Sequence, residues 1–404
     1  MSRLSLQRWR RQLFGSVPDT VLSLGLGALG AWAAWGFLHW AFGQAQWLVV
    51  RANAATLAIG RYPEAQEWRL WLLLGMLVSL TGLSWGLLRG RGGAAAPGWP
   101  INDRIAAALL GLLTLALPPL LAFGAINQGR LLCLWGLLLL LRTLAGRWGT
   151  HPWAQRLAKG WPLVWAGAYL LGLWLIGGGL GLTPVRPSDW GGLLFTLLIT
   201  SLTLLLALPL GVLLALGRRS ELPLLRWVSV AYIELIRGAP LITLLFLGQN
   251  LVGFLLPGGL APDRVWRAAA VLTGFAAAYG AEAVRGGLNA VPRGQLEASR
   301  SLGLSTAQTL ALVVLPQALK VALPALVGQC IALLQDTTLL SIIGLFDLLG
   351  IARNVLANPD WLGRYAEVYL VLAVLYWGSC AALSLGSRAL EKRLSSHNLR
   401  PSHR

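Results

Sequence analysis

Charged side chains are scarce in this sequence. Asp, Glu, Lys and Arg together make up 12% of its 404 residues, whereas hydrophobic residues make up 56%. Soluble domains usually carry about 25% charged residues. The scarcity of charge therefore excludes an ordinary soluble protein and indicates a chain that lies in a membrane.

Cysteine and histidine are also rare, with three and four residues. Cys133, Cys330 and Cys380 lie in apolar stretches without a CxxC spacing, which excludes a disulfide framework and a zinc site. The histidines form no HExxH motif and no pattern of a nucleophile beside a base, and a GxxxxGK[ST] phosphate loop is missing. We therefore expect no metal, no cofactor and no enzymatic activity in this chain.

Acidic residues are fewer than half as many as basic ones, 15 against 33, and the net charge is +18. The basic residues are scattered between apolar runs and form no single patch, which argues against a nucleic-acid partner. With the N-terminus inside, 24 of the 33 lie in the inner connections between runs and 9 in the outer ones. Because basic residues favour the cytoplasmic side, we expect both termini in the cytoplasm.

Apolar runs of about 20 residues recur along the whole chain, and each could cross a hydrocarbon core about 30 Å thick. They predict an all-α, polytopic membrane protein with about ten transmembrane helices. One of them carries Arg142 and Arg147 near its inner end, where both side chains would have to reach toward water; a re-entrant loop there would change the polarity of the first half. The predicted helices are 21–43, 69–88, 105–126, 131–148, 161–181, 191–217, 227–257, 267–289, 317–345 and 363–388.

A polar segment, residues 291–316, lies between two of these helices and carries capping signals. Pro292 suits the first position of a helix, and Gly303 suits the left-handed residue that follows a helix end. Ser305 with Gln308 forms an S-x-x-Q capping box. The pattern predicts two short helices bent at Gly303. Capping chemistry alone leaves an ordinary polar loop as the alternative.

Several spaced motifs follow one another in the second half of the chain. They are YIELIRGAP at 232–240, AYGAEAVRGG at 278–287, VPRGQ at 291–295, LPQAL at 315–319 and DTTLLSIIG at 336–344. Together with Glu297-Ala298-Ser299 and Gly303, the pattern resembles the "EAA" loop and core of ABC importer permeases of the histidine and glutamine uptake type, in which Ala stands in place of Ser299. The match covers about residues 190–390. The long form is similar to bacterial general or acidic/neutral L-amino-acid permeases.

The resemblance implies a division of the chain and a set of partners. Residues 1–190 would hold extra transmembrane helices, 191–390 a permease core of five helices, and 391–404 a basic cytoplasmic tail. The chain would import polar, acidic or neutral L-amino acids across a bacterial inner membrane. Its partners would be a cytoplasmic ABC ATPase dimer that binds ATP and Mg, a second permease subunit or a second copy of this chain, a periplasmic amino-acid-binding protein, and the lipid bilayer.

The resemblance also assigns roles to residues of the polar segment. In the family the EAA loop forms a coupling helix that sits in a cleft of the ATPase and transmits its closure to the membrane helices. By position, the coupling residues are Gln295, Glu297, Ala298, Ser299, Leu302 and Gly303.

Two acidic and basic pairs lie near the inner ends of predicted helices. Glu234 with Arg237, and Glu282 with Arg285, are spaced i to i+3, so each pair shares one helix face. Each pair could be a local ion pair that anchors the membrane interface. Alternatively, the pairs could form a cytoplasmic gate or a receptor for the coupling helix.

Asp336 lies within a predicted membrane helix, where an isolated carboxylate is costly. The ammonium group of an amino acid could pair with it, while Thr337, Thr338 and Gln329 offer neutral hydrogen bonds in a substrate path. Alternatively, Asp336 caps a break in the helix and never touches the cargo. The family usually has Lys before this Asp, where Gln335 stands here.

The alternative functions are an ion-driven secondary transporter and a membrane scaffold. A secondary transporter would be expected to show related inverted halves with paired broken helices. The two halves of this sequence do not match in that way.

Overall fold

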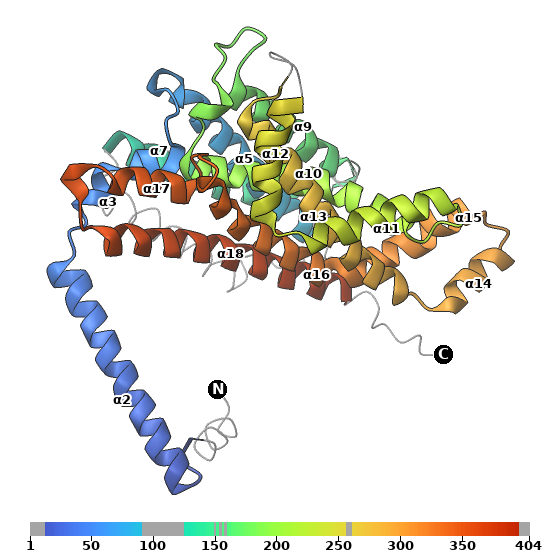
Figure 1. Cartoon of the computed structure of the whole chain (residues 1–404), viewed down its shortest axis with the longest axis horizontal. Helices are drawn as coiled ribbons and strands as arrows, with labels where there is room; N and C mark the ends of the chain where they lie inside the picture. The colour runs from blue at the N-terminus through green and yellow to red at the C-terminus, as the bar shows by residue number, and fades with distance from the viewer. Residues whose placement is uncertain are drawn as a thin grey trace. The chain divides into compact units, whose positions relative to one another are not determined.

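The computed structural model in Figure 1 is built almost entirely from helices. It describes residues 13–90, 125–148, 151–152, 156, 160–255 and 261–395. Within these ranges the only β pairing consists of three isolated bridges. The predicted all-α class is therefore confirmed. The chain divides into two compact units, Met1–Val49 and Val50–Arg404.

The described part of the first unit is dominated by one long helix. Helix α2 spans Val17–His39 and continues as a π-helical turn, Trp40–Gln44. The Ser16 hydroxyl caps its start by accepting a hydrogen bond from the N–H of Asp19. Helix α2 has no buried residue, and a helix that is apolar all round suits contact with lipid.

A short helix near the start of the second unit, α4, packs against the start of α10. Helices α3 and α4 span Leu48–Ala52 and Ala54–Ile59, and α10 spans Gly192–Gly217. Gly192 has a φ of +62°, and a Cβ at this position would lie 2.3 Å from the carbonyl oxygen of Leu57. Only glycine permits this close approach between α4 and α10.

Helices α5 (Glu67–Gly90) and α7 (Ala125–Trp148) pack side by side. A Cβ at Gly82 would lie 2.8 Å from the Leu138 carbonyl oxygen. One helical turn further on, a Cβ at Gly86 would lie 2.5 Å from the Cβ of Ala145. Two glycines four residues apart let membrane helices approach closely.

Gly82 faces Leu138, and the later Gly86 faces the later Ala145. Helices α5 and α7 therefore run in the same direction. The predicted helix 131–148 is thus a continuous 24-residue helix, α7, and not a re-entrant loop. The side chain of Arg142 does not extend to water as expected. It is 6% exposed, and its guanidinium lies 4.9 Å above the Trp85 ring, where the ring face attracts the cation. Arg147 is exposed.

Helix α9, Trp161–Gly177, packs against α5. The indole N–H groups of Trp161 and Trp165 both donate to the Ser84 hydroxyl, at 2.7 and 3.1 Å. At the other end of α5, the buried Arg69 donates to the carbonyl and hydroxyl oxygens of Thr183. The tryptophan bonds join α9 to α5, and the Arg69 bonds join α5 to the connection that leads into α10.

Helix α13 (Arg264–Asn289) lies at the centre of the second half, between α10 and α16 (Leu315–Asp336). A Cβ at Gly211 of α10 would lie 3.0 Å from the Ala277 carbonyl oxygen. A Cβ at Gly287 of α13 would lie 2.2 Å from the carbonyl oxygen of Ala318. Small residues on both faces of α13 therefore set the spacing of the three helices.

The predicted helix 227–257 is wrong as a single helix. The structure has two helices, α11 (Pro223–Gly238) and α12 (Leu241–Leu255), bent by 107°. Pro240 has no backbone N–H and disfavours a helical conformation at the residue before it. Ala239 is accordingly extended, with φ −99° and ψ 140°.

The predicted helix 317–345 is also too long. Helix α16 ends at Asp336 and tightens into a 3₁₀ turn, Thr337–Ser341. A further helix that was not predicted, α17 (Leu348–Leu356), follows it, and α18 spans Tyr365–Ser395. The helices predicted at 191–217, 267–289 and 363–388 are confirmed as α10, α13 and α18.

Six described helices are long and apolar enough to cross a membrane, and a seventh if α11 and α12 form one broken span. The number ten is not confirmed. Residues 105–124 of the predicted helix 105–126 lie outside the described residues, as do residues 396–404 of the predicted basic tail. Boundaries at residues 190 and 390 stay a prediction.

Candidate functional site

The polar segment after α13 forms the expected bent structure. Helix α14 spans Arg293–Ser301, with Pro292 as its N-cap and not as its first helical residue. Gly303 follows with a φ of +75°, a conformation that favours glycine. Ser305 and Gln308 then form a complete capping box.

The second short helix does not stand alone. Helix α15 comprises Thr306–Gln308 and continues through a π-helical stretch, Thr309–Val314, into α16. The segment therefore contains one separate helix, α14. A tight turn joins it to α15 and the π-helical stretch, which lengthen α16 at its N-terminal end. In Figure 1, α14 and α15 lie at the opposite end of the second unit from α17.

The predicted coupling residues divide between two faces of α14 and its turn. Gln295, Glu297, Ala298 and Gly303 are exposed, and Leu302 is 80% exposed. An exposed leucine at a helix end, beside an exposed carboxylate, offers a contact surface to another protein.

Ser299 points the other way from these residues. It is buried, and its hydroxyl donates to the Leu296 carbonyl. Leu296 packs against a buried apolar cluster that includes Val291, Val314 and Ala318. The inner face of α14 is thereby attached to the ends of α13 and α16.

A cluster of charges lies where α10, α11 and α13 meet. Glu282 accepts hydrogen bonds from Arg218 at 2.9 Å and from Arg285 at 2.7 Å, and Arg237 lies 3.7 Å away. Glu234 pairs with Arg218 at 2.9 Å. We call these five residues the Glu282 cluster.

The sequence predicted two separate pairs, Glu234 with Arg237 and Glu282 with Arg285, but the structure joins these residues in one cluster. The Glu282 and Arg285 pair is present, but Arg237 contacts Glu282 and the Tyr279 ring, and no ion pair joins it to Glu234 in the described chain. Arg218 was missed as a site residue. Its signal was a cation at the C-terminal end of a helix, where a helix dipole favours one.

The predicted substrate-path residues lie around the end of α16 but do not form one group. Asp336 and Gln329 are seven residues apart, two helical turns along one face, and neither side chain has a polar partner among the described residues. Thr337 is buried and donates to the Leu334 carbonyl, while Thr338 donates to that of Gln335. Both threonines therefore satisfy the backbone at the helix break.

Asp347 is a buried acidic residue that sequence reasoning missed. It caps α17 by accepting hydrogen bonds from the N–H groups of Leu349 and Gly350, at 3.1 and 2.9 Å. The N–H of Leu348 donates to the hydroxyl of Thr196 on α10. Burial raises the pKa of Asp347 to about 7, although the N–H groups of Leu349 and Gly350 act to lower it. Its signal was an acid directly before an apolar run, as in an N-cap.

Comparison with known proteins identifies the family. Residues 207–396 match the family described as "Binding-protein-dependent transport system inner membrane component". The "Inner membrane amino-acid ABC transporter permease protein YhdY" of Escherichia coli is 35% identical, and the match covers 96% of this chain and 92% of the relative. This chain belongs to the amino-acid ABC transporter permeases.

A second relative agrees with this assignment. The "Glutamate/glutamine/aspartate/asparagine transport system permease protein BztC" of Rhodobacter capsulatus is 35% identical over 86% of this chain and 78% of the relative. The solved structure described as "Crystal structure of an amino acid ABC transporter with histidines" is 33% identical, covers 50% of this chain and 92% of its own, and has a TM-score of 0.45.

The family membership decides several expectations. The chain is a multi-span inner-membrane permease subunit and not an enzyme, because ATP hydrolysis in ABC transporters takes place on a separate subunit. The alternatives of an ion-driven secondary transporter and a membrane scaffold gain no support from these relatives.

Replacing Glu282 by Gln should destabilise the protein more than the same change at Glu234. Glu282 is 16% exposed and faces three guanidinium groups, whereas Glu234 is 56% exposed and faces one. We expect Glu282→Gln to cost about 2 kcal/mol, because it leaves partly buried cations unpaired. Glu234→Gln should cost less than about 1 kcal/mol. Thermal unfolding in detergent measures both, and equal losses would contradict the central place of Glu282.

Asp347 should make the stability depend on pH. An unfolded Asp loses its proton near pH 3.9, but the folded protein holds it up to about pH 7. The contribution of protonated Asp347 to the free energy of unfolding is therefore complete below about pH 4 and is lost as the pH rises to about 7. Asp347→Asn keeps an N-cap acceptor and cannot titrate, so its melting temperature should change less over this range. Parallel curves for wild type and variant would contradict the prediction.

Proposed function

We propose that this permease moves polar, acidic or neutral L-amino acids inward by alternating access, driven by a separate ATPase dimer that docks on α14. The observation that carries the coupling role is the two-sided construction of α14. Its outer face presents Glu297, Ala298 and Leu302, and its inner face is attached to the core. A force on the outer face would thus move α13 and α16.

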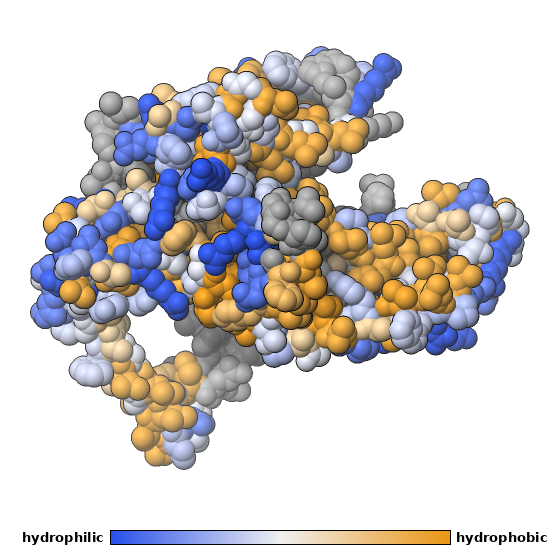
Figure 2. Space-filling view, turned by 45° about the horizontal axis from the view of Figure 1, so that its top comes forward, coloured by the Kyte–Doolittle hydropathy of each residue, from blue (hydrophilic) through white to orange (hydrophobic). Residues whose placement is uncertain are grey.

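Polar side chains support a cytoplasmic position for this end of the molecule. Figure 2 shows an apolar band over the region of α11, with hydrophilic residues gathered at the end where α14 and α15 lie in Figure 1. The apolar face of α11 includes the exposed Leu224, Trp227 and Leu235. We infer that the apolar band lies in the bilayer and that α14 faces the cytoplasm. The excess of basic residues in the inner connections supports cytoplasmic termini.

The Glu282 cluster supports a role as a gate at the inner end. It joins α10, α11 and α13, and Gln317 of α16 donates to Gln295 of α14 close to the same helix ends. Movement of α14 would reach α16 first and then the helix that carries Glu282. Ion pairs of this kind can break and form again without loss of packing.

The remaining partners follow from the same proposal. A permease core needs a second one across the translocation path, which would be a paralogous subunit or a second copy of this chain. A periplasmic amino-acid-binding protein would deliver the cargo on the outer side. The cargo class is consistent with the relative named for glutamate, glutamine, aspartate and asparagine transport.

Glu297→Arg should abolish coupling without unfolding the permease. Glu297 is exposed and has no ion-pair partner in the described chain, so its replacement by Arg reverses an outward-facing charge and breaks no ion pair there. We expect loss of copurified ATPase and of uptake in reconstituted vesicles. Glu221→Arg, the same change at another exposed position, is the control. Normal uptake by Glu297→Arg, with no ATPase copurified by the wild type, would overturn the proposed function.

Asp336 is proposed to contact the cargo ammonium group in the translocation path. Asp336→Asn removes a charge-assisted hydrogen bond of about 1.5 kcal/mol or more, so uptake should fall roughly tenfold while assembly is unchanged. Asp360→Asn, in an exposed turn, is the matched control. Full uptake by Asp336→Asn would leave Asp336 with the alternative role of a residue at the helix break.

A further inference from the structure

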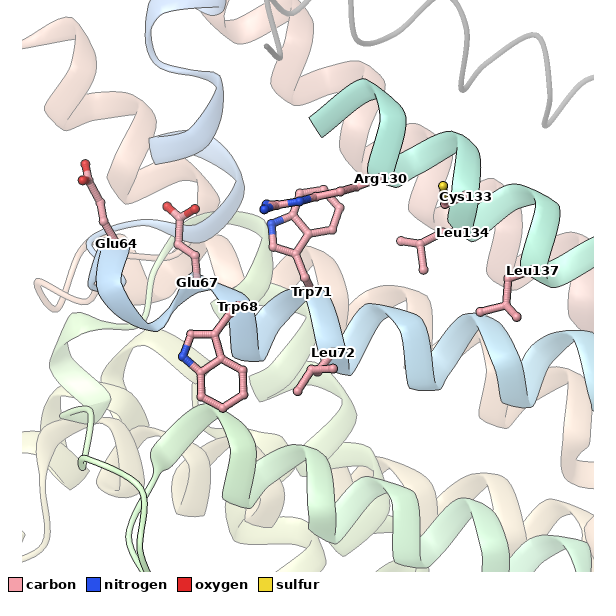
Figure 3. A pocket seen from close by; sticks show the side chains of 9 residues that line it. All are labelled: Glu64, Glu67, Trp68, Trp71, Leu72, Arg130, Cys133, Leu134 and Leu137. Atoms are coloured by element: carbon pink, nitrogen blue, oxygen red, sulfur yellow. The ribbon is translucent and has the colours of Figure 1, made fainter. Parts of the chain in front are cut away.

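A groove lies on the first half of the chain, away from the proposed coupling segment and substrate path. It has a volume of about 750 Å³ and lies between α5 and α7, at the ends where both helices begin. Figure 3 shows its side chains on these two helices and on the turn before α5. The lining residues are Glu64, Glu67, Trp68, Trp71, Leu72, Arg130, Cys133, Leu134 and Leu137.

The groove has two free carboxylates at its polar end. Glu64 and Glu67 have no hydrogen-bond or ion-pair partner for their side chains among the residues that the structure describes. Glu67 is the first residue of α5 and Glu64 begins the 3₁₀ turn before it, and a negative charge near a helix start suits the helix dipole. Both side chains therefore remain available to a cation from outside the chain.

A guanidinium group is held beside these carboxylates. Arg130 lies 5.3 Å above the Trp71 ring, and it donates to Asn127 at 3.3 Å. In Figure 3 its side chain extends along α5 toward Glu67. An arginine leaves several N–H groups free after one hydrogen bond, and its planar fork matches the oxygens of a phosphate.

The rest of the groove is apolar. Trp68 and Leu72 are 48% and 53% exposed, and Leu134 and Leu137 are half-buried on the facing helix. These residues continue from the charged end for about two helical turns, or roughly 10 Å, along α5 and α7. Both helices are candidate membrane spans, so the apolar part lies at the depth of acyl chains.

We propose that this groove binds a zwitterionic phospholipid with a primary ammonium headgroup, such as phosphatidylethanolamine. The ammonium group donates to Glu64 and Glu67, the phosphate accepts from Arg130, and an acyl chain lies along Leu72, Leu134 and Leu137. Two carboxylates against one guanidinium disfavour an anionic lipid. A free amino acid would satisfy the charged end but leave the apolar wall without a partner.

Cys133 reports occupancy of the groove. It lines the groove one turn from Arg130 and is a free, exposed thiol. The full chain is placed in nanodiscs of phosphatidylglycerol with or without phosphatidylethanolamine, and maleimide labelling of the Cys133 peptide is followed by mass spectrometry. With lipid at ten times its dissociation constant, labelling of Cys133 should slow roughly tenfold. Labelling of Cys380 should not change with the headgroup.

Matched variants and lipids decide the proposal. The double variant Glu64→Gln, Glu67→Gln should label at the unprotected rate in every lipid, whereas Glu221→Gln should behave as the wild type. Equal labelling rates with and without phosphatidylethanolamine would overturn the proposal, as would equal protection by phosphatidylcholine, which lacks the N–H donors. Protection by free L-glutamine in discs without phosphatidylethanolamine would assign the groove to a soluble zwitterion instead.

Discussion

Helices inside a membrane gain little from burying apolar side chains against each other, because lipid tails are as apolar as leucine. Their association depends on close contact between backbones, which small residues permit. In this permease that contact is concentrated on α13. Gly287 brings α13 against the Ala318 carbonyl of α16, and Gly211 brings α10 against Ala277. The other helices of the core take their positions from these two contacts.

The same helix carries charge toward its C-terminal end. Glu282 stands one turn before Gly287 and gathers guanidinium groups from α10, α11 and its own helix. The backbone contact therefore fixes α13 and α16 as a rigid pair, while the ion pairs join it to α10 and α11 by bonds that can be exchanged. Helix α14 is attached to the rigid pair through Leu296 and Ser299. This arrangement suits a proposed path from an ATPase to the membrane helices.

The first half of the chain follows the same packing rule with a different result. Gly82 and Gly86 bring α7 into close contact with α5, in the way that Gly287 brings α16 against α13. The guanidinium groups of Arg130 and Arg142 on α7 lie over tryptophan rings of α5. Arg130 also lines the proposed lipid groove. The buried Arg69 then joins α5 to the connection before α10. Helix α5 is thus bonded to the segment that leads into α10.

Local chemistry was enough to predict the helical class, the cap and turn around Gly303, and the family, because each depends on residues close together in the chain. Pro240 also held the signal for the 107° bend, although the apolar run across it favoured one long helix. The partners of Glu282 and the burial of Asp347 could not be predicted. Arg218 is 64 residues from Glu282, and Thr196 is 152 residues from Leu348. Spacing along one helix predicts only i to i+3 and i to i+4 neighbours. Which distant helix supplies a charge or a hydroxyl was decided by the tertiary packing, since glycine and alanine contacts set the distance and rotation between helices.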